Sequence, residues 1–421
     1  MNVLLKSAKV ISPGSPYNGK RVDILIENGI IRSIKTNIKE KNSKIFEAEN
    51  IHVSPGWFDM QVNFRDPGYE YKEDLISGTK AAAHGGYTGV AIMPSTHPPI
   101  HTKADVEYIK NKTADSIVDV FPVGALSYNL EGKDISEMYD MYRSGAVAFS
   151  DDKKSIADAG LLMRALLYAK NFNGLIMTHC DERDISAGGT MNEGNTSTAL
   201  GLKGMPALAE ELMVARNIYL AEYTESRIHI SSVSTAKSVQ LIREAKAKKL
   251  KITASVNAYN LILEDNHLED FDTNCKVNPP LRVKSDIEAL KKGLTDGTID
   301  VIVSDHSPED EENKKTEFDH AAFGITGLES SFAIANTVRG RLGLEKLIDK
   351  MALNPRKILN LPVPGIEEGQ KANLTLFNPE LNWKLEKRHI HSKSKNTPFI
   401  GTALQGKALA IYNKGKFLVS I

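Results

Sequence analysis

Two hydrophobic patterns alternate along the middle of the chain, from about residue 52 to residue 364. Short apolar runs typical of buried strands are followed by stretches in which apolar residues recur every three to four positions, as in amphipathic helices. Apolar strands that alternate with helices predict a parallel sheet covered by helices, and eight such units predict a closed, TIM-type (β/α)8 barrel. The eight strand runs are 56–64, 88–95, 116–126, 146–152, 174–180, 227–234, 251–258 and 299–307.

The two ends of the chain have strand-like runs and turn residues without helical periodicity. Asn28 and Gly29 separate two alternating apolar runs near the N-terminus, and residues 413–415 do so near the C-terminus. An Asn-Gly pair between such runs is a strong hairpin signal. We therefore expect residues 1–51 and 365–421 to form one composite β-sandwich domain beside a barrel of residues 52–364.

Composition and charge exclude several classes of protein. The chain has 421 residues with 53 Lys and Arg against 53 Asp and Glu, so its formal net charge of zero disfavours a nucleic-acid binder. Its two cysteines, Cys180 and Cys275, cannot form a disulfide framework. Neither a signal peptide nor an apolar run of membrane-spanning length is present. We expect a cytoplasmic protein that binds neither nucleic acid nor membrane.

Polar residues gather where the predicted barrel strands end. Chemistry in (β/α)8 barrels takes place at the C-terminal ends of the strands, on the loops that follow them. Because side chains alternate along a strand, Asp59, Gln61 and Asn63 share one face of the first strand. Acidic residues and a histidine end three further strands, at 151–152, at 179 and at 305. The sequence therefore predicts an active site, or its remnant, at this end of the barrel.

Six runs in the chain carry a resemblance to a known family. They are SPGWFDMQVNFRDPG (54–68), AFSDD (148–152), VNPPLR (277–282), SDHSP (304–308), FGITGLES (323–330) and NTPFIGTALQG (396–406). In these runs the sequence resembles dihydroorotase, a metal-dependent amidohydrolase, in the form that uses aspartate as bridging ligand. The resemblance implies a distorted (β/α)8 barrel with a small β-sandwich, zinc as cofactor, and reversible hydrolysis of dihydroorotate to N-carbamoyl-aspartate in pyrimidine biosynthesis.

Half of the six metal ligands that the resemblance implies are missing. The two histidines of the first strand correspond to Gln61 and Asn63, and the histidine of the sixth strand corresponds to Ser232. All three losses are imidazoles, which zinc favours. We therefore expect no cofactor, or at most one weakly bound divalent metal. The remnant ligands are Asp152, His179 and Asp305.

The substrate contacts that the resemblance implies are partly kept. Arg65 and Asn278 match the residues that hold the substrate carboxylate, whereas Ser95 stands where an asparagine is expected. Asp305 occupies the proton-transfer position, and without an activated water we expect it to be idle. Glu309 replaces an expected histidine. The fold is thus predicted to persist while the chemistry is impaired.

Several of these residues have alternative interpretations. Lys153, which follows the two aspartates, could replace the charge of a metal, although simple solvent exposure is favoured. Arg65 could pair with Asp305 or Asp152 instead of a substrate, and the two possibilities are equally supported. Gln61 and Asn63 are expected to hydrogen-bond one another and buried water.

Three functions follow from these expectations. We favour a pseudoenzyme that acts as a structural or regulatory partner, of aspartate transcarbamoylase or of an active dihydroorotase paralogue, and that forms a homo-oligomer. The first alternative is a cyclic-amide hydrolase with a reduced, single-metal site. The second is a sensor that binds a carboxylate ligand through Arg65 and Asn278 and hydrolyses nothing.

Overall fold

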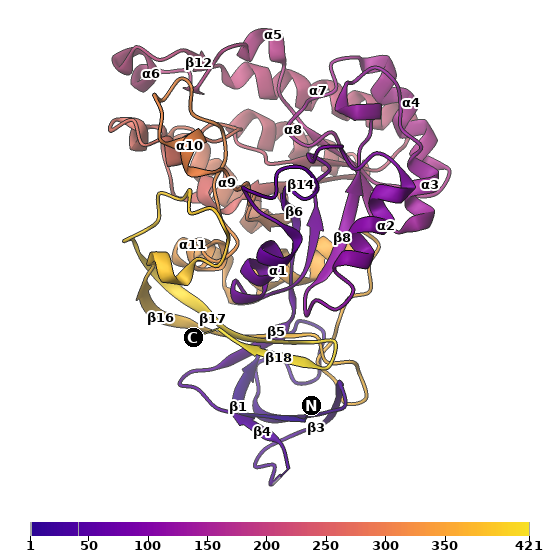
Figure 1. Cartoon of the computed structure of the whole chain (residues 1–421), viewed down its shortest axis with the longest axis vertical. Coiled ribbons are helices and arrows are strands. Elements are labelled where there is room, and N and C mark those ends of the chain that lie inside the picture. The colour runs from indigo at the N-terminus through magenta and orange to yellow at the C-terminus, as the bar shows by residue number, and fades with distance from the viewer. Residues whose placement is uncertain (1, 41, 421) are drawn as a thin grey trace.

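A nearly closed barrel of eight parallel strands forms the larger part of the molecule (Figure 1). The computed structural model describes residues 2–40 and 42–420. The barrel closes where the backbone N–H of Asn63 donates to the carbonyl oxygen of His306 at 2.8 Å. Each predicted strand run overlaps one of these strands, so the predicted (β/α)8 barrel is confirmed. In chain order they are β6 (Trp57–Val62), β7 (Tyr87–Ile92), β8 (Asp119–Gly124), β9 (Ala148–Phe149), β10 (Ile176–His179), β13 (Ile228–Ser231), β14 (Ile252–Asn257) and β15 (Val301–Val303).

Helices surround the barrel, and side chains fix where several of them begin. The Asp74 carboxylate accepts from the backbone N–H groups of Ile76 and Ser77 at the start of α1, and Thr102 and Thr235 cap α2 and α8. No helix in the described ranges is long and apolar enough to cross a membrane. The helices are α1 (Leu75–His84), α2 (Lys103–Lys112), α3 (Met138–Ser144), α4 (Ala159–Lys170), α5 (Arg183–Ser186), α6 (Asn195–Leu200), α7 (Ala207–Thr224), α8 (Ala236–Ala247), α9 (Lys284–Asp296), α10 (Glu311–Lys314), α11 (Ser331–Thr337), α12 (Leu344–Ile348) and α13 (Asn354–Ile358).

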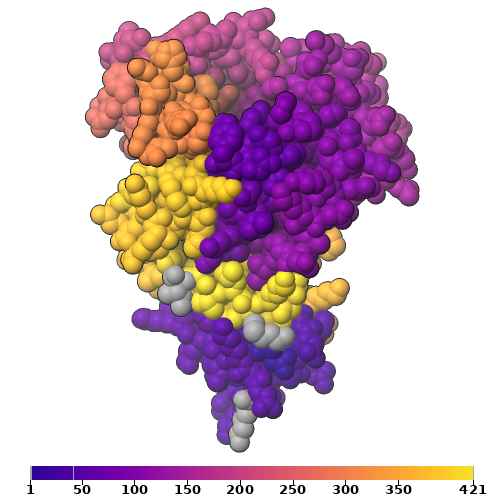
Figure 2. Space-filling view, viewed as in Figure 1, coloured from indigo at the N-terminus to yellow at the C-terminus, as the bar shows by residue number. Residues whose placement is uncertain are grey.

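The strands of both chain ends pair in one eight-stranded sheet. The predicted hairpin turns at Asn28-Gly29 and at Lys414-Gly415 connect β2 to β3 and β17 to β18. Side chains from both ends pack in a single hydrophobic cluster, and Figure 2 shows the C-terminal residues in yellow between the indigo N-terminal strands and the barrel. The strands are β1 (Val3–Val10), β2 (Arg21–Glu27), β3 (Ile30–Lys35), β4 (Lys44–Phe46), β5 (His52–Pro55), β16 (Leu374–Lys384), β17 (Ala403–Asn413) and β18 (Lys416–Val419); a small separate pair is β11 (Met191–Asn192) with β12 (Gly204–Met205).

One strand joins the two parts of the molecule. β5 pairs with β1 and with β16, so residues 52–55 belong to the sheet of the termini and not to the barrel, where the sequence placed them. Only Gly56 separates β5 from β6. A Cβ atom at this glycine would lie 2.0 Å from Oδ1 of Asn373 and 2.1 Å from Oγ1 of Thr88, so no larger residue fits without a shift.

Candidate active site

The carboxylate of Asp305, two residues beyond β15, is the centre of the polar cluster at the C-terminal end of the barrel. Its Oδ1 accepts a hydrogen bond from Nε2 of Gln61 at 2.7 Å. Its Oδ2 accepts from the hydroxyl of Tyr259 at 2.6 Å and from Nδ2 of Asn257 at 3.3 Å. The ammonium of Lys153 lies 2.8 Å from Oδ1 and 2.9 Å from Oδ2. Because a carboxylate offers about four lone-pair sites, these donors saturate Asp305.

Lys153 reaches this carboxylate from the loop after β9. Its side chain is 26% exposed, whereas that of Asp305 is 4% exposed. The ammonium also donates to the backbone carbonyl of Asn278 at 2.7 Å. The expectation of a solvent-exposed Lys153 was therefore wrong. The physical reason is that a buried carboxylate without a positive partner is costly, and the flexible lysine stem lets the ammonium supply that charge.

Asp152 and His179, the other remnant ligands, lie around the same ammonium. Oδ2 of Asp152 accepts from the hydroxyl of Ser95 at 2.6 Å. Burial raises the pKa of Asp152, and the charge of Lys153 opposes that rise. Burial, together with the charge of Lys153, lowers the pKa of His179 to about 3, so its imidazole is neutral. Oδ1 of Asp152 has no hydrogen-bond partner among the described residues, whereas the imidazole of His179 interacts with the side chain of Asn278.

Two of the side chains at the lost-ligand positions, those of Gln61 and Ser232, hydrogen-bond within the protein. Nε2 of Gln61 donates to the hydroxyl of Ser232 at 2.9 Å as well as to Asp305. Gln61 and Asn63 do not bond one another as expected, and Oδ1 of Asn63 has no partner in the described part of the chain. The amide of Gln61 thus presents protons to Asp305, whereas a metal ligand would present a lone pair.

These residues do not fit the metal pair that the resemblance implies. Within residues 2–40 and 42–420, no three His, Cys, Asp or Glu side chains are placed so that they could hold a metal ion. The ammonium of Lys153 contacts both oxygens of Asp305, and Nε2 of Gln61 donates to Oδ1. A cation at this carboxylate would have to displace Lys153 first.

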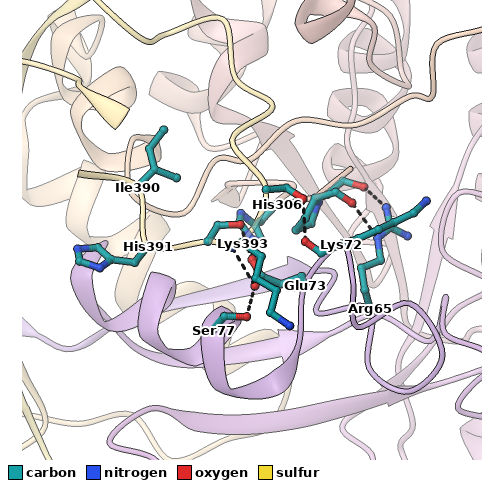
Figure 3. A network of polar contacts seen from close by, with 12 residues as sticks. Arg65, Lys72, Glu73, Ser77, His306, Ile390, His391 and Lys393 are labelled. Carbon is teal, nitrogen blue, oxygen red and sulfur yellow. Dashed lines mark hydrogen bonds and ion pairs between the residues drawn. The ribbon is translucent and has the colours of Figure 1, made fainter. Parts of the chain in front are cut away.

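Arg65, expected to hold a substrate carboxylate or to pair with Asp305 or Asp152, instead contacts the loop after β15. Its Nη2 lies 2.8 Å from Oε1 of Glu309 and donates to the hydroxyl of Ser307 at 2.8 Å. Nζ of Lys72 pairs with the other oxygen of Glu309 at 2.6 Å (Figure 3). Arg65, Lys72 and Ser95 line a cavity of about 610 Å³. The guanidinium of Arg65 is therefore neutralised by a carboxylate of the protein itself.

A second buried network, which sequence reasoning missed, holds the loops around the site (Figure 3). The carboxylate of Glu73 accepts from the hydroxyls of Ser77 and Ser392. Nε2 of His306 lies 3.5 Å from Oε2 of Glu73, and the backbone N–H of Gly327 donates to Nδ1 of the same imidazole at 3.2 Å. Nδ1 of His306 is thus engaged by the backbone of Gly327, and its Nε2 faces the carboxylate of Glu73. The network joins the start of α1, the loop after β15 and the C-terminal segment.

Three further candidate residues are His229, Cys180 and Asn278. His229 is fully buried and its Nδ1 contacts the hydroxyl of Thr253 at 2.9 Å, so it packs in the core and replaces no ligand. Burial raises the pKa of the Cys180 thiol to about 12, which makes it a poor nucleophile. Asn278 lies at the site through its backbone carbonyl, which accepts from Lys153, and through its side chain, which interacts with the imidazole of His179.

Comparison with known proteins identifies the family. A family model described as dihydro-orotase-like matches residues 51–238. A dihydroorotase of Syntrophus aciditrophicus is 41% identical over 99% of this chain and 99% of its own length. A dihydroorotase of a Thermoanaerobacter species is 44% identical, covering 96% of this chain and 94% of its own. The chain belongs to the dihydroorotase family.

Solved structures confirm the fold of this dihydroorotase-family chain. An L-hydantoinase from Arthrobacter aurescens superposes with a TM-score of 0.87 over 99% of this chain and 96% of its own, at 23% identity. A dihydropyrimidinase from Brevibacillus agri gives a TM-score of 0.84 at 21% identity, over 100% of this chain and 95% of its own. At such identities the likeness establishes only the architecture, a barrel with an added strand sheet. The chemistry has to be inferred from the residues of the site.

Proposed function

We propose that this member of the dihydroorotase family does not hydrolyse dihydroorotate and instead acts as a structural or regulatory partner of another protein. The observation that supports this most is the pairing of Lys153 with Asp305, at 2.8 Å, in the place where a metal-dependent relative needs a free carboxylate. The ammonium of Lys153 neutralises the buried carboxylate of Asp305 and at the same time blocks the approach of a metal ion to it.

The chemistry left to the residues of the site is limited. Cyclic-amide hydrolysis requires a water that attacks the carbonyl and a base that removes its proton. Asp305 would be that base, but the donors from Gln61, Tyr259, Asn257 and Lys153 use its lone pairs. A water that no metal activates keeps the very high pKa of bulk water, so almost no hydroxide is present at neutral pH. His179 is neutral but lies beside the ammonium of Lys153, whose charge disfavours protonation of its ring.

The two alternatives have weaker support. A hydrolase with a single metal would need Asp152, His179 and Asp305 as ligands, and the structure does not place these three in a metal-holding group. A carboxylate sensor would need Arg65 free for its ligand, but Arg65 is bound to Glu309 at 2.8 Å. A ligand carboxylate would have to compete with Glu309 for the same guanidinium.

The direct test of the proposal is an assay of the purified chain in both directions of the reaction. Dihydroorotate and N-carbamoyl-aspartate are offered separately, with added zinc and with a chelator, and a catalytically intact relative serves as positive control. We expect turnover at background under both conditions. A rate of about one per second or more, within the ordinary range of enzymes, would refute the proposal.

The partner role rests on the family and on the intact fold. We propose aspartate transcarbamoylase or an active dihydroorotase paralogue from the same cytoplasm as the partner. Co-purification of the tagged chain with each candidate, followed by measurement of the candidate's activity with and without this chain, tests the role. A stoichiometric complex with altered stability or activity supports it, and independent elution of both candidates at micromolar concentration contradicts it.

A further inference from the structure

A cavity of about 850 Å³ lies between the N-terminal end of the barrel and the sheet of the chain termini. It is lined by the start of β8, the loop after α13, the segment before β16 and the two hairpin turns. A volume of this size is typical of small-molecule sites, which span about 300–1,000 Å³. The barrel strands are parallel, so the start of β8 lies at the opposite end of the barrel from Asp305, which follows β15. The cavity is thus separate from the candidate active site.

The guanidinium of Arg356, in α13, forms part of the cavity wall although the residue is only 4% exposed. Its Nη1 donates to the carbonyl oxygens of Gly56 and Ala352, and its Nη2 donates to the hydroxyl of Thr88 at 3.0 Å. Of its five N–H groups, the one on Nε and one of the two on Nη2 have no acceptor among the described residues. A planar guanidinium uses such a pair of donors to bind a carboxylate or a phosphate side by side.

The positive charge of Arg356 has no carboxylate partner of its own among the described residues. Burial lowers the pKa of Arg356 to about 9, and the charge of Asp119 opposes this only in part. Both oxygens of Asp119 are engaged elsewhere. Its Oδ1 lies 3.1 Å from Nζ of Lys414, and its Oδ2 accepts from Nδ2 of Asn413 at 2.9 Å. The guanidinium therefore stays charged at neutral pH, and a buried charge without a counter-ion favours an added anion.

The rest of the lining combines positive charge with apolar surface. Lys371 and Lys414 also line the cavity, so that among the described residues three cations face it with one acid, Asp119. The ring of Phe121 belongs to the apolar part of the wall, and the other apolar residues are Ile30, Leu361, Pro362, Val363 and Pro364. A pocket that places one charged group beside apolar walls binds the charged head of a ligand together with its apolar body.

We infer that this cavity binds a small organic anion whose carboxylate or phosphate group pairs with Arg356 and whose apolar body packs against Phe121. The bound oxyanion supplies the counter-ion that the described residues do not provide. The ligand contacts the barrel at β8 and also the hairpin turns of the terminal sheet, so its binding stabilises the native state of the chain. The inference does not depend on the proposed function, because no residue at the opposite end of the barrel takes part.

Isothermal titration calorimetry of the full chain at low ionic strength tests the inference with four probes. They are inorganic phosphate, phenyl phosphate, benzoate and benzamide. Benzamide has the shape of benzoate without its charge, so it measures the apolar contact alone. We expect phenyl phosphate or benzoate to bind with a Kd of about 1 mM or lower, and benzamide to bind at least about tenfold more weakly than the tighter of these two anions. Phenyl phosphate as the tighter probe identifies a phosphate ester as the ligand class, and benzoate identifies a carboxylate. Inorganic phosphate should bind more weakly than phenyl phosphate, because it lacks the apolar body.

Two variants and a matched control locate the binding site. Arg356→Gln should weaken binding of the tighter anion at least about tenfold. Because Arg356 also holds two backbone carbonyls, the exposed Lys371 provides a second variant, and Lys371→Glu should weaken binding at least about threefold. Lys237→Glu makes the same change on α8, outside the cavity lining, and should leave the affinity within about twofold of the wild-type value. Circular dichroism verifies that each variant is folded.

Weaker anion binding by the cavity variants, with unchanged binding by the Lys237→Glu control, supports the inference. If Arg356→Gln does not fold, the comparison of Lys371→Glu with the control decides. Three results would overturn the inference: a wild-type chain that binds neither aromatic anion, benzamide that binds as tightly as benzoate and phenyl phosphate, or a Lys371→Glu variant that binds as the control does.

Discussion

Replacing Lys153 with methionine removes the only ammonium in ion-pair contact with Asp305 among the described residues. The methionine keeps most of the aliphatic stem, so the change isolates the charge. Three neutral donors remain on the carboxylate, from Gln61, Tyr259 and Asn257. We therefore expect the native state to lose stability because a buried carboxylate is left without a positive partner.

The size of the destabilisation depends on how deeply Lys153 and Asp305 are each buried. Removing one partner of a fully buried pair costs about 3–5 kcal/mol. Since the Lys153 side chain is 26% exposed, water compensates in part, and we expect a loss of about 2–4 kcal/mol. The unfolding entropy of so long a chain is large, near ~2 cal/mol/K per residue, so Tm falls by only about 1 °C per kcal/mol. Urea denaturation at fixed temperature is therefore the better assay.

The controls for this experiment lie in the same site. Lys154→Met alters the exposed residue next to Lys153, and its free energy of unfolding should be within about 0.5 kcal/mol of the wild-type value. Adding Asp305→Asn to Lys153→Met removes the uncompensated charge, and the double variant should regain more than half of the lost free energy. If Lys153→Met unfolds at the same urea concentration as the Lys154→Met control, the ammonium does not compensate Asp305 and the reasoning is refuted.

Three further outcomes are expected. Elemental analysis of the purified chain should find far less than one zinc per chain, and a value close to two would contradict the site described above. A triple variant should bind zinc more tightly when Lys153→Gly is added, as measured by competition with a chromogenic chelator; its substitutions are Gln61→His, Asn63→His and Ser232→His. Equal zinc affinity with and without Lys153 would contradict the blocking role of this lysine. Glu73→Gln should lower the free energy of unfolding by about 1–3 kcal/mol near pH 7. Burial alone would raise the pKa of Glu73, but the hydrogen bonds from His306, Ser392 and Ser77 outweigh burial and hold that pKa below 4.5. The stabilisation by ionised Glu73 is thus present above pH ~4.5 and is lost on acidification. Lys395 is the nearby basic group. If the difference in free energy of unfolding between the variant and the wild type stayed constant down to pH ~3, this assignment would be contradicted.

The architecture could be predicted from the sequence because it depends on repeated local patterns. Apolar runs located all eight barrel strands, and turn residues at Asn28-Gly29 and Lys414-Gly415 located both hairpins. The assignment of residues 52–55 to the barrel was wrong because an apolar run does not reveal its pairing partner. β5 pairs with β16, more than 300 residues away along the chain.

The partners of the charged side chains could not be predicted in the same way. A lysine on a loop can place its ammonium anywhere within several ångströms, so position alone did not reveal that Lys153 reaches Asp305. Arg65 and Glu309 are 244 residues apart, and only the exchange of an expected histidine for an acid at 309 hinted at a new ion pair. Glu73 and His306 offered no spacing signal, because the network they form brings together three distant loops.

The position of β5 has a consequence for how the protein is made on the ribosome. β5 directly precedes the first barrel strand, yet one of its two neighbours, β16, begins only at Leu374. At about 5–20 residues per second, synthesis of the intervening 318 residues takes roughly 16–64 s. During that time the free edge of β5 has no partner from its own chain, so it is open to pairing with strands of neighbouring nascent chains.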